Sequence, residues 1–242
     1  MVNSLKDKKI VVIGGSSGIG FETAKLFAES GSNVVIGGRD QAKLNRKKIE
    51  LRGNVEAFSI DIMNLDSVQF FFERVGKFDH LHIPASNMKT GSLKDFEIAL
   101  ARQSFDSKFW GPYQVAKIAL SYLSDVGSMT FFSGAYSQRP IASGAAIGSA
   151  INSAIEGLVR ALAVELAPIR VNAISPGLTM TERFTENYSP EALKALTENF
   201  SEHLLIKRPA ESTEVALAAK YLTECSYVTG TTLFVDGGLS LH

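Results

Sequence analysis

A glycine-rich turn is the part of the sequence whose residue types and spacing point most directly to a chemical task. The segment Gly14-Gly15-Ser16-Ser17-Gly18-Ile19-Gly20 follows the apolar run Lys9–Ile13. In such a turn the first glycine permits a sharp bend, the second lets the backbone approach a pyrophosphate, and the third allows close helix–strand packing. A helix starting here would offer N–H groups and its positive dipole end to phosphates. The sequence therefore predicts a dinucleotide cradle made of Gly14, Ser16, Ser17, Gly18, Ile19 and Gly20.

The next apolar run carries the residues that would choose between two dinucleotides. An acidic side chain after this run would hydrogen-bond the ribose 2′-hydroxyl of NAD. Here the chain reads Ile36-Gly37-Gly38-Arg39-Asp40, so a glycine takes that place and Arg39 follows it. A guanidinium forms charge-assisted bonds to a 2′-phosphate, which favours NADP(H). Asp40 leaves NAD as the alternative reading if it neutralises Arg39 instead of capping the next helix.

Composition narrows the class of protein and of partner. The 242 residues carry 25 basic and 25 acidic side chains, so no overall field attracts nucleic acid or an anionic membrane. Cys225 is the single cysteine, which excludes an internal disulfide, predicts a small core residue, and suggests a cytoplasmic location. The N-terminal Met1–Lys9 lacks the apolar run of a signal peptide, and no uninterrupted apolar stretch is long enough for a membrane span.

Apolar runs of strand type alternate with segments of helical period along almost the whole chain. The predicted strands are 9–13, 33–36, 55–60, 81–83, 128–132, 170–174 and 232–235. The predicted helices are 19–30, 41–52, 65–75, 94–123, 146–166, 190–202 and 212–222, with Pro112 expected to kink or break the long one. This alternation predicts an α/β protein: one doubly wound Rossmann-type domain over residues 1–242, with a seven-stranded, mostly parallel sheet.

The chain from Lys9 to Gly238 resembles the short-chain dehydrogenase/reductase family. The likeness rests on the glycine turn, on Ser59-Ile60-Asp61-Ile62, on Val171-Asn172-Ala173-Ile174-Ser175-Pro176-Gly177, and on Val235-Asp236-Gly237-Gly238. The resemblance implies that Asp61 and Ile62 hold the adenine ring and that Thr181 meets the nicotinamide amide. It also places Ala85, Ser86, Pro176, Gly177 and Thr179 at the cofactor, and it implies homodimers or homotetramers built on the helices 94–123 and 146–166.

The family's reaction positions look different in this chain. The resemblance implies a Tyr and, four residues later, a Lys, but these positions read Gly148 and Asn152. The usual Ser appears as Gly134, with Ser133 as the nearest hydroxyl, and the usual Asn position holds Lys108. Because glycine carries no proton donor, the ordinary acid–base catalysis, worth about 10²–10⁴-fold, has lost its group.

Two interpretations follow from these departures. In the first, the chain is an NADP(H)-dependent oxidoreductase in which Lys108, Ser133, Asn152 and Tyr136 form a different reaction site, with Tyr113 as another candidate acid. In the second, it binds NADP(H) without catalysis, as a sensor or an assembly subunit. The alternatives without a catalytic role are that Lys108 is a surface lysine and that Tyr136 is an aromatic residue of the packing. The expected partner is a small-molecule substrate, with no nucleic acid, no membrane and no metal; His82 is expected to be a core residue.

Overall fold

Seven parallel strands form the central sheet in the computed structural model, which describes residues 4–140, 143–182 and 188–241. Their order across the sheet is β3-β2-β1-β4-β5-β6-β9. The strands are β1 Lys9–Ile13, β2 Asn33–Gly38, β3 Val55–Ser59, β4 Phe78–Ile83, β5 Leu123–Phe132, β6 Arg170–Pro176 and β9 Thr232–Val235. The order reverses between β1 and β4, which is where doubly wound sheets open a crevice at the carboxyl ends of their strands.

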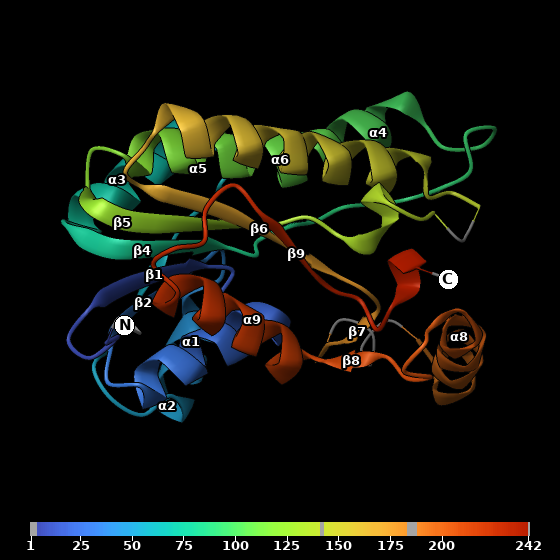
Figure 1. The fold of residues 1–242 in the computed structure, drawn as a ribbon, viewed down its shortest axis with the longest axis horizontal. Coiled ribbons are helices and arrows are strands. Elements are labelled where there is room, and N and C mark those ends of the chain that lie inside the picture. Colours follow the sequence, from blue (N-terminus) through green and yellow to red (C-terminus); the bar gives the residue numbers. More distant parts are fainter. Residues whose placement is uncertain (1–3, 141–142, 183–187, 242) are drawn as a thin grey trace.

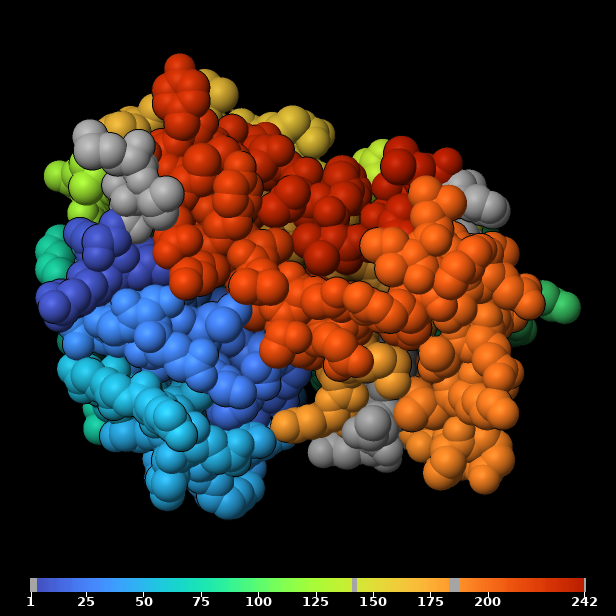
Figure 2. All heavy atoms as spheres, turned by 60° about the horizontal axis from the view of Figure 1, so that its bottom comes forward, coloured from blue at the N-terminus to red at the C-terminus, as the bar shows by residue number. Residues whose placement is uncertain are grey.

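Helices cover both faces of the sheet, as Figure 1 shows. One face carries α3 Leu65–Val75, α4 Ile98–Phe105, α5 Gly111–Ala119 and α6 Ala146–Glu165; the other carries α1 Gly18–Glu29, α2 Gln41–Glu50 and α9 Ser212–Glu224. Apart from this body lie α8 Pro190–His203 and the short strands β7 Thr179–Met180 and β8 Ala210–Glu211. In the space-filling view, the orange α8 region projects beside the blue α1–α2 half (Figure 2). The expected α/β fold with a seven-stranded parallel sheet is confirmed.

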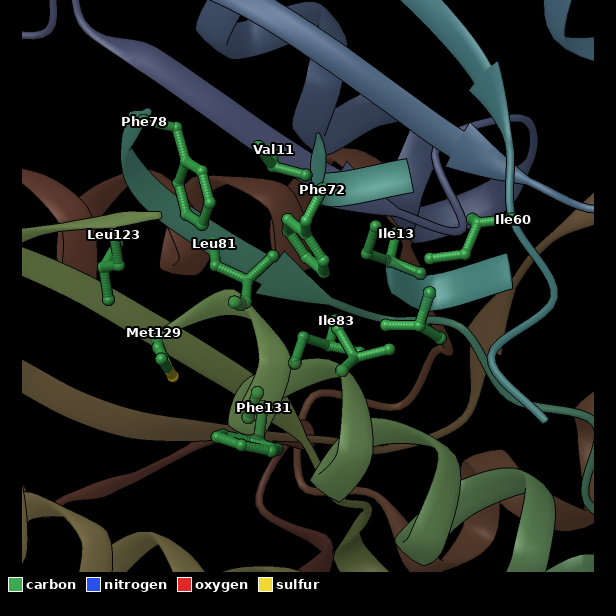
Figure 3. Packing of buried hydrophobic residues seen from close by; sticks show 14 of the residues in the cluster. Val11, Ile13, Ile60, Phe72, Phe78, Leu81, Ile83, Leu123, Met129 and Phe131 are labelled. Atoms are coloured by element: carbon green, nitrogen blue, oxygen red, sulfur yellow. The ribbon is translucent and has the colours of Figure 1, made fainter. Parts of the chain in front are cut away.

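Both faces of the sheet are apolar, because alternate side chains of each strand point to opposite sides. Val11 and Ile13 join Leu81 and Phe131 in the cluster under α3–α6, drawn in Figure 3. Their neighbours Ile10 and Val12 pack into the second cluster, under α1. Within the aromatic run after Gln69, Phe71 and Phe72 are buried whereas Phe70 is 68% exposed, so only part of that run belongs to the core.

The predicted helix over 94–123 is wrong in its bounds, whereas the irregularity expected near Pro112 is present. The helix begins at Ile98, turns into a π-helical segment at Asp106–Trp110, and resumes as α5 up to Ala119; Leu123 already belongs to β5. Pro112 explains the irregularity, because it has no N–H to donate to the carbonyl of Lys108. The N–H of Gly111 instead bonds the carbonyl of Asp106, five residues back.

Helix α6 is long and apolar enough, by length and composition, to span a membrane, and among the described helices it alone meets that test. In the fold, however, one of its sides lies against the sheet, with Ile151, Ile155 and Val159 in the main core. It is therefore a core helix of the α/β domain. A second sequence expectation needs correction: Cys225 is partly exposed rather than a core residue.

Candidate functional site

A cavity of about 820 Å³ lies at the carboxyl ends of the strands, where the sheet order reverses. Every residue expected at the cofactor lines it: Gly14, Ser16, Ser17, Gly18, Ile19, Gly20, Arg39, Asp61, Ile62, Ala85, Ser86, Pro176, Gly177, Thr179 and Thr181. The four expected reaction residues, Lys108, Ser133, Tyr136 and Asn152, line the same cavity. The residues that the sequence predicts for cofactor binding and those that it predicts for the reaction therefore line one cavity.

The glycine turn has the geometry of a phosphate cradle. Gly14 has a φ of +98°, and a Cβ atom there would lie 2.9 Å from the backbone nitrogen of Ala85, so only glycine fits. A Cβ on Gly18 would lie 3.1 Å from a methyl of Thr181, which brings the far side of the cavity against the turn. Helix α1 begins at Gly18, and its N-cap Ser17 makes no side-chain capping bond. The first N–H groups of α1 are therefore not capped by Ser17 and can meet an anion.

Asp40 caps a helix and leaves Arg39 unneutralised. Its carboxylate accepts the backbone N–H of Lys43 at 2.9 Å, at the start of α2. That bond, the leading cause, lowers the pKa of Asp40. Within residues 4–140, 143–182 and 188–241, Arg39 makes no ion pair. Together with Ser16 and Gly38, Arg39 forms a cationic end of the cavity.

Glu182 connects the segment after β7 to α2, across this cationic end. Its carboxylate lies 3.5 Å from Nζ of Lys43 and 3.3 Å from Nζ of Lys47. Thr181, the preceding residue, lines the cavity. The wall contributed by residues 176–181 is thus tied to α2 by ion pairs at its outer end.

At the opposite end of the cavity, the π-helical segment presents Lys108. Its Nζ donates to the carbonyl oxygen of Ser133 at 2.9 Å, so the ammonium is held at the end of β5 rather than on the outer surface. The hydroxyl of Ser133 donates in turn to Glu156 at 2.9 Å. The surface-lysine reading of Lys108 is therefore wrong.

At this end of the cavity, the side chain of Asn152 occupies the space beside Gly134. Asn152 is 3% exposed, and its Oδ1 finds no hydrogen-bond partner among the residues that the structure describes. Its Nδ2 lies 2.8 Å from where a Cβ of Gly134 would be. A buried amide oxygen without a partner costs stability, and Asn152 is nevertheless one of the residues that line the cavity.

The two tyrosines that were candidate acids, Tyr136 and Tyr113, lie in different places. Tyr136 lines the cavity, and burial raises the pKa of its phenol. Tyr113 stacks on Phe109 and meets Trp110 edge-on, on the outer side of α5, and it does not line the cavity. Tyr136 keeps its proton at neutral pH and can donate a hydrogen bond, whereas Tyr113 has no access to the site.

An apolar wall completes the cavity beyond Lys108. It consists of Met88, Tyr188, Leu196, Phe200 and Leu239, with Leu196 and Phe200 one turn apart on α8. Apart from Arg39 and Asp61 at the adenine end, Lys108 is the charged residue among the described lining residues. This half of the cavity suits an apolar molecule with an electron-rich group.

The buried histidines lie elsewhere, as expected for His82. Its Nε2 pairs with Thr223 at 3.0 Å, and His80 pairs with Ser128 at 2.9 Å, beneath α9. Burial, the leading cause, lowers the pKa of His80 to about 4 and that of His82 to about 3. No three potential metal ligands come together in the part of the chain that the structure describes.

Sequence reasoning missed Glu156 and the apolar wall from α8. A glutamate on a helix is normally solvent-exposed, so only its place one turn after Asn152, on the same helix face, could have indicated burial. Leu196 and Phe200 carry the helical spacing of an ordinary core face. Nothing in that spacing tells a cavity wall from a packed core.

Comparison with known proteins gives a consistent family. Residues 13–240 match the family model described as enoyl-(acyl carrier protein) reductase. A short-chain dehydrogenase/reductase of Stachybotrys chlorohalonatus is 31% identical, over 99% of this chain and 99% of that protein. The human 3-oxoacyl-[acyl-carrier-protein] reductase is also 31% identical, over 97% of this chain and 99% of that protein.

Solved structures agree with these sequence matches. A crystal structure of a small-chain dehydrogenase in complex with NADPH has a TM-score of 0.84 and 36% identity, covering 98% of this chain and 100% of that one. Ligand-free aldohexose dehydrogenase of Thermoplasma acidophilum has a TM-score of 0.87 and 26% identity, covering 100% of this chain and 97% of that one.

Proposed function

The chain belongs to the short-chain dehydrogenase/reductase family, and on that premise we propose that it is an NADP(H)-dependent oxidoreductase with an unusual reaction site. The observation that carries the proposal is the ammonium of Lys108, held by Ser133 in the cavity that contains the glycine turn. The usual tyrosine and lysine positions, read as Gly148 and Asn152, offer no acid there.

The residues present fit a dinucleotide phosphate. The N-terminus of α1 would take the pyrophosphate, Arg39 the 2′-phosphate, and Asp61 with Ile62 the adenine. Ala85, Ser86, Pro176, Gly177, Thr179 and Thr181 would enclose the nicotinamide half. The NADPH complex of the 36% identical relative supports this choice of cofactor.

When bound, the nicotinamide would supply hydride chemistry, because that capacity resides in the cofactor. The protein must then place a carbonyl or activated alkene beside it and stabilise the developing negative charge. Lys108 would carry this electrostatic role and supply the proton at Nζ, with the phenol of Tyr136 as a second donor. Met88, Leu196 and Phe200 would exclude water around an apolar substrate.

The test is NADPH oxidation against ketones, aldehydes, enones and quinones. Lys108→Met should lower kcat by about 10²-fold or more while the Kd for NADPH stays within about threefold, because a proton donor is lost but not a cofactor contact. Lys117→Met, on the exposed side of α5, is the matched control and should behave as wild type. An unchanged kcat in Lys108→Met would contradict the proposed site.

Gly148 favours one alternative, a noncatalytic NADP(H)-binding sensor or assembly subunit. A Cβ there would meet Met88 Cε at 3.3 Å, so the position faces a cavity-lining residue but carries no reactive group. Tight NADPH binding with no turnover on the whole panel would establish this alternative. Failure to bind NADPH would exclude both functions.

We also propose a homodimer or homotetramer that uses the helices over 98–119 and 146–165. Trp110 is 54% exposed, and Val164 is 82% exposed, on α6. Large exposed apolar side chains on adjacent helices are typical of association surfaces. Light scattering should give twice or four times the 26.2 kDa chain mass, and a monomer would contradict this assembly.

A further inference from the structure

Glu156 is a buried carboxylate for which the family resemblance supplies no role. It is 4% exposed and lies one turn after Asn152 on α6. Its Oε1 accepts the hydroxyl of Ser133 at 2.9 Å, and its Oε2 accepts the amide of Gln138 at 3.4 Å. It has no salt-bridge partner within the part of the chain that the structure describes. Burying a carboxylate beside neutral donors costs stability, so this arrangement requires a compensating use.

Ser133 is held at three atoms, each by a different element. Its backbone N–H donates to the carbonyl of Ile174 on β6 at 2.8 Å. Its hydroxyl donates to Glu156 on α6, and its carbonyl accepts Nζ of Lys108 from the π-helical segment. The position of the ammonium in the cavity therefore depends on the orientation of the Ser133 carbonyl.

Backbone hydrogen bonds flank the Ser133–Gly134 peptide: the N–H of Ser133 donates to Ile174, and the carbonyl of Gly134 accepts the N–H of Ser137 at 3.0 Å. Gly134 follows directly, and glycine restricts its own backbone angles less than any other residue. Gly134 sits at the end of β5, where the strand pairing with β6 has stopped at Phe132. The bond from the Ser133 hydroxyl to Glu156 is the side-chain contact that adds to these backbone bonds in resisting rotation of the carbonyl to which Lys108 is anchored.

We infer that Glu156 is a positioning residue for Lys108, acting through the two ends of Ser133. Its carboxylate fixes the Ser133 hydroxyl, the fixed residue directs its carbonyl into the cavity, and that carbonyl holds the ammonium. The effect on the reaction rests on the proposed function, whereas the effect on Lys108 itself does not need a cofactor.

The first experiment measures Lys108 in the cofactor-free protein. Its rate of acetylation by an N-hydroxysuccinimide ester is followed by mass spectrometry and normalised to Lys117. Glu156→Leu and Ser133→Ala each remove the bond and should raise the Lys108 rate by about fivefold, the equivalent of one ordinary hydrogen bond of about 1 kcal/mol. Glu156→Gln keeps an acceptor oxygen and should stay within about twofold of wild type.

The matched control is Glu165→Gln, an exposed glutamate on the same helix. Unchanged Lys108 rates in both Glu156→Leu and Ser133→Ala would overturn the inference. If Glu156→Leu does not fold, Ser133→Ala alone decides, because it leaves α6 unaltered.

The second experiment uses the carbonyl compound that the wild-type protein reduces fastest. Glu156→Leu should lower kcat by about tenfold or more, with KM and the Kd for NADPH within about threefold, because misplacement of a reacting group reduces rate rather than binding. The double variant Ser133→Ala/Glu156→Leu should be no slower than the slower single variant, since both remove one contact. If the losses in kcat of the two single variants added up in the double variant, Ser133 and Glu156 would not act through one contact.

The two proposals fail in distinguishable ways. Wild-type protein that does not bind NADPH rejects the proposed function while the acetylation result still supports or rejects the role of Glu156. NADPH turnover that is unaffected by Glu156→Leu rejects the positioning role while leaving the oxidoreductase proposal intact.

Discussion

The side-chain nitrogen of Asn152 lies 2.8 Å from the point where a Cβ on Gly134 would stand. The backbone at Gly134 is extended, with a φ of 171°, so any residue could adopt it and the restriction comes from Asn152 alone. Gly134 and Asn152 are therefore one structural unit, because the glycine makes room for the amide.

The first prediction follows from this contact. Gly134→Ser should lower the free energy of unfolding by about 1–3 kcal/mol, since the new side chain must displace a buried amide. Denaturant unfolding measures the change. Adding Asn152→Ala should restore most of the loss, and a double variant as unstable as the single one would show that the clash lies elsewhere.

The second prediction concerns cofactor choice. Arg39→Leu should raise the Kd for NADP⁺ by roughly 10–100-fold, the value of a charge-assisted bond, and leave the Kd for NAD⁺ nearly unchanged. Fluorescence titration with both nucleotides measures this. Arg46→Leu, an exposed arginine on α2, serves as control; equal losses for NADP⁺ and NAD⁺ would contradict recognition of the 2′-phosphate by Arg39.

The third prediction concerns pH. Burial lowers the pKa of His80 to about 4 and that of His82 to about 3, so both stay neutral in the folded chain at pH values where the unfolded chain has protonated them. The unfolded state then binds more protons, and stability falls as pH drops below about 6.5, by up to about 1.4 kcal/mol per pH unit for each histidine.

The denaturant concentration at the unfolding midpoint, measured at pH values from about 8 down to about 4, tests this trend. His82→Leu should flatten the slope, although it leaves the Thr223 hydroxyl with only its bond to the Ala219 carbonyl. A wild-type slope of zero between these limits would show that the two histidines titrate normally in the folded state.

The fourth prediction concerns Arg170, which is buried and does not line the cavity. Its guanidinium donates to the carbonyls of Leu222 at 2.7 Å, Thr223 at 2.9 Å and Val228 at 3.1 Å. Arg170→Leu removes the guanidinium from the carbonyls of Leu222 and Thr223, while that of Val228 keeps the amide of Asn172, and should cost about 3 kcal/mol of unfolding free energy. The Kd for NADPH should stay within about threefold, because Arg170 does not line the cavity. A neutral effect on stability would exclude this capping role.

The fifth prediction concerns the apolar wall. Phe200→Ala should raise KM for an apolar ketone by about tenfold, because an aromatic contact worth about 1.5 kcal/mol or more is lost, with the Kd for NADPH little changed. Asn199→Ala, on the exposed side of α8, is its control. If Phe200→Ala changed NADPH binding and not KM, this wall would belong to the cofactor.

The sequence predicted most of the architecture because periodicity and glycine spacing are local. The bounds of β1, α3 and β9 came out as expected, and every expected cofactor residue reached one cavity. What failed depends on non-local or irregular backbone: β7 and β8 have only two residues each, and the π-helical segment has no periodic pattern.

The candidate site was predictable only in part for the same reason. Lys108 could be recognised as unusual by its position, but its bond to Ser133 joins residues 25 positions apart. Glu156 carries no signal in the sequence, because sequence alone does not show that Ser133 would meet it. Contacts of this kind depend on how α6 packs against the end of β5.

The ion pairs of Glu182 with Lys43 and Lys47 have a kinetic consequence. They tie the cavity wall formed by residues 176–181 to α2, so we expect them to slow the movement of this wall and with it the release of a dinucleotide. Partly exposed ion pairs weaken as mobile ions screen them. The residence time of the cofactor, as distinct from its affinity, should therefore shorten as ionic strength rises.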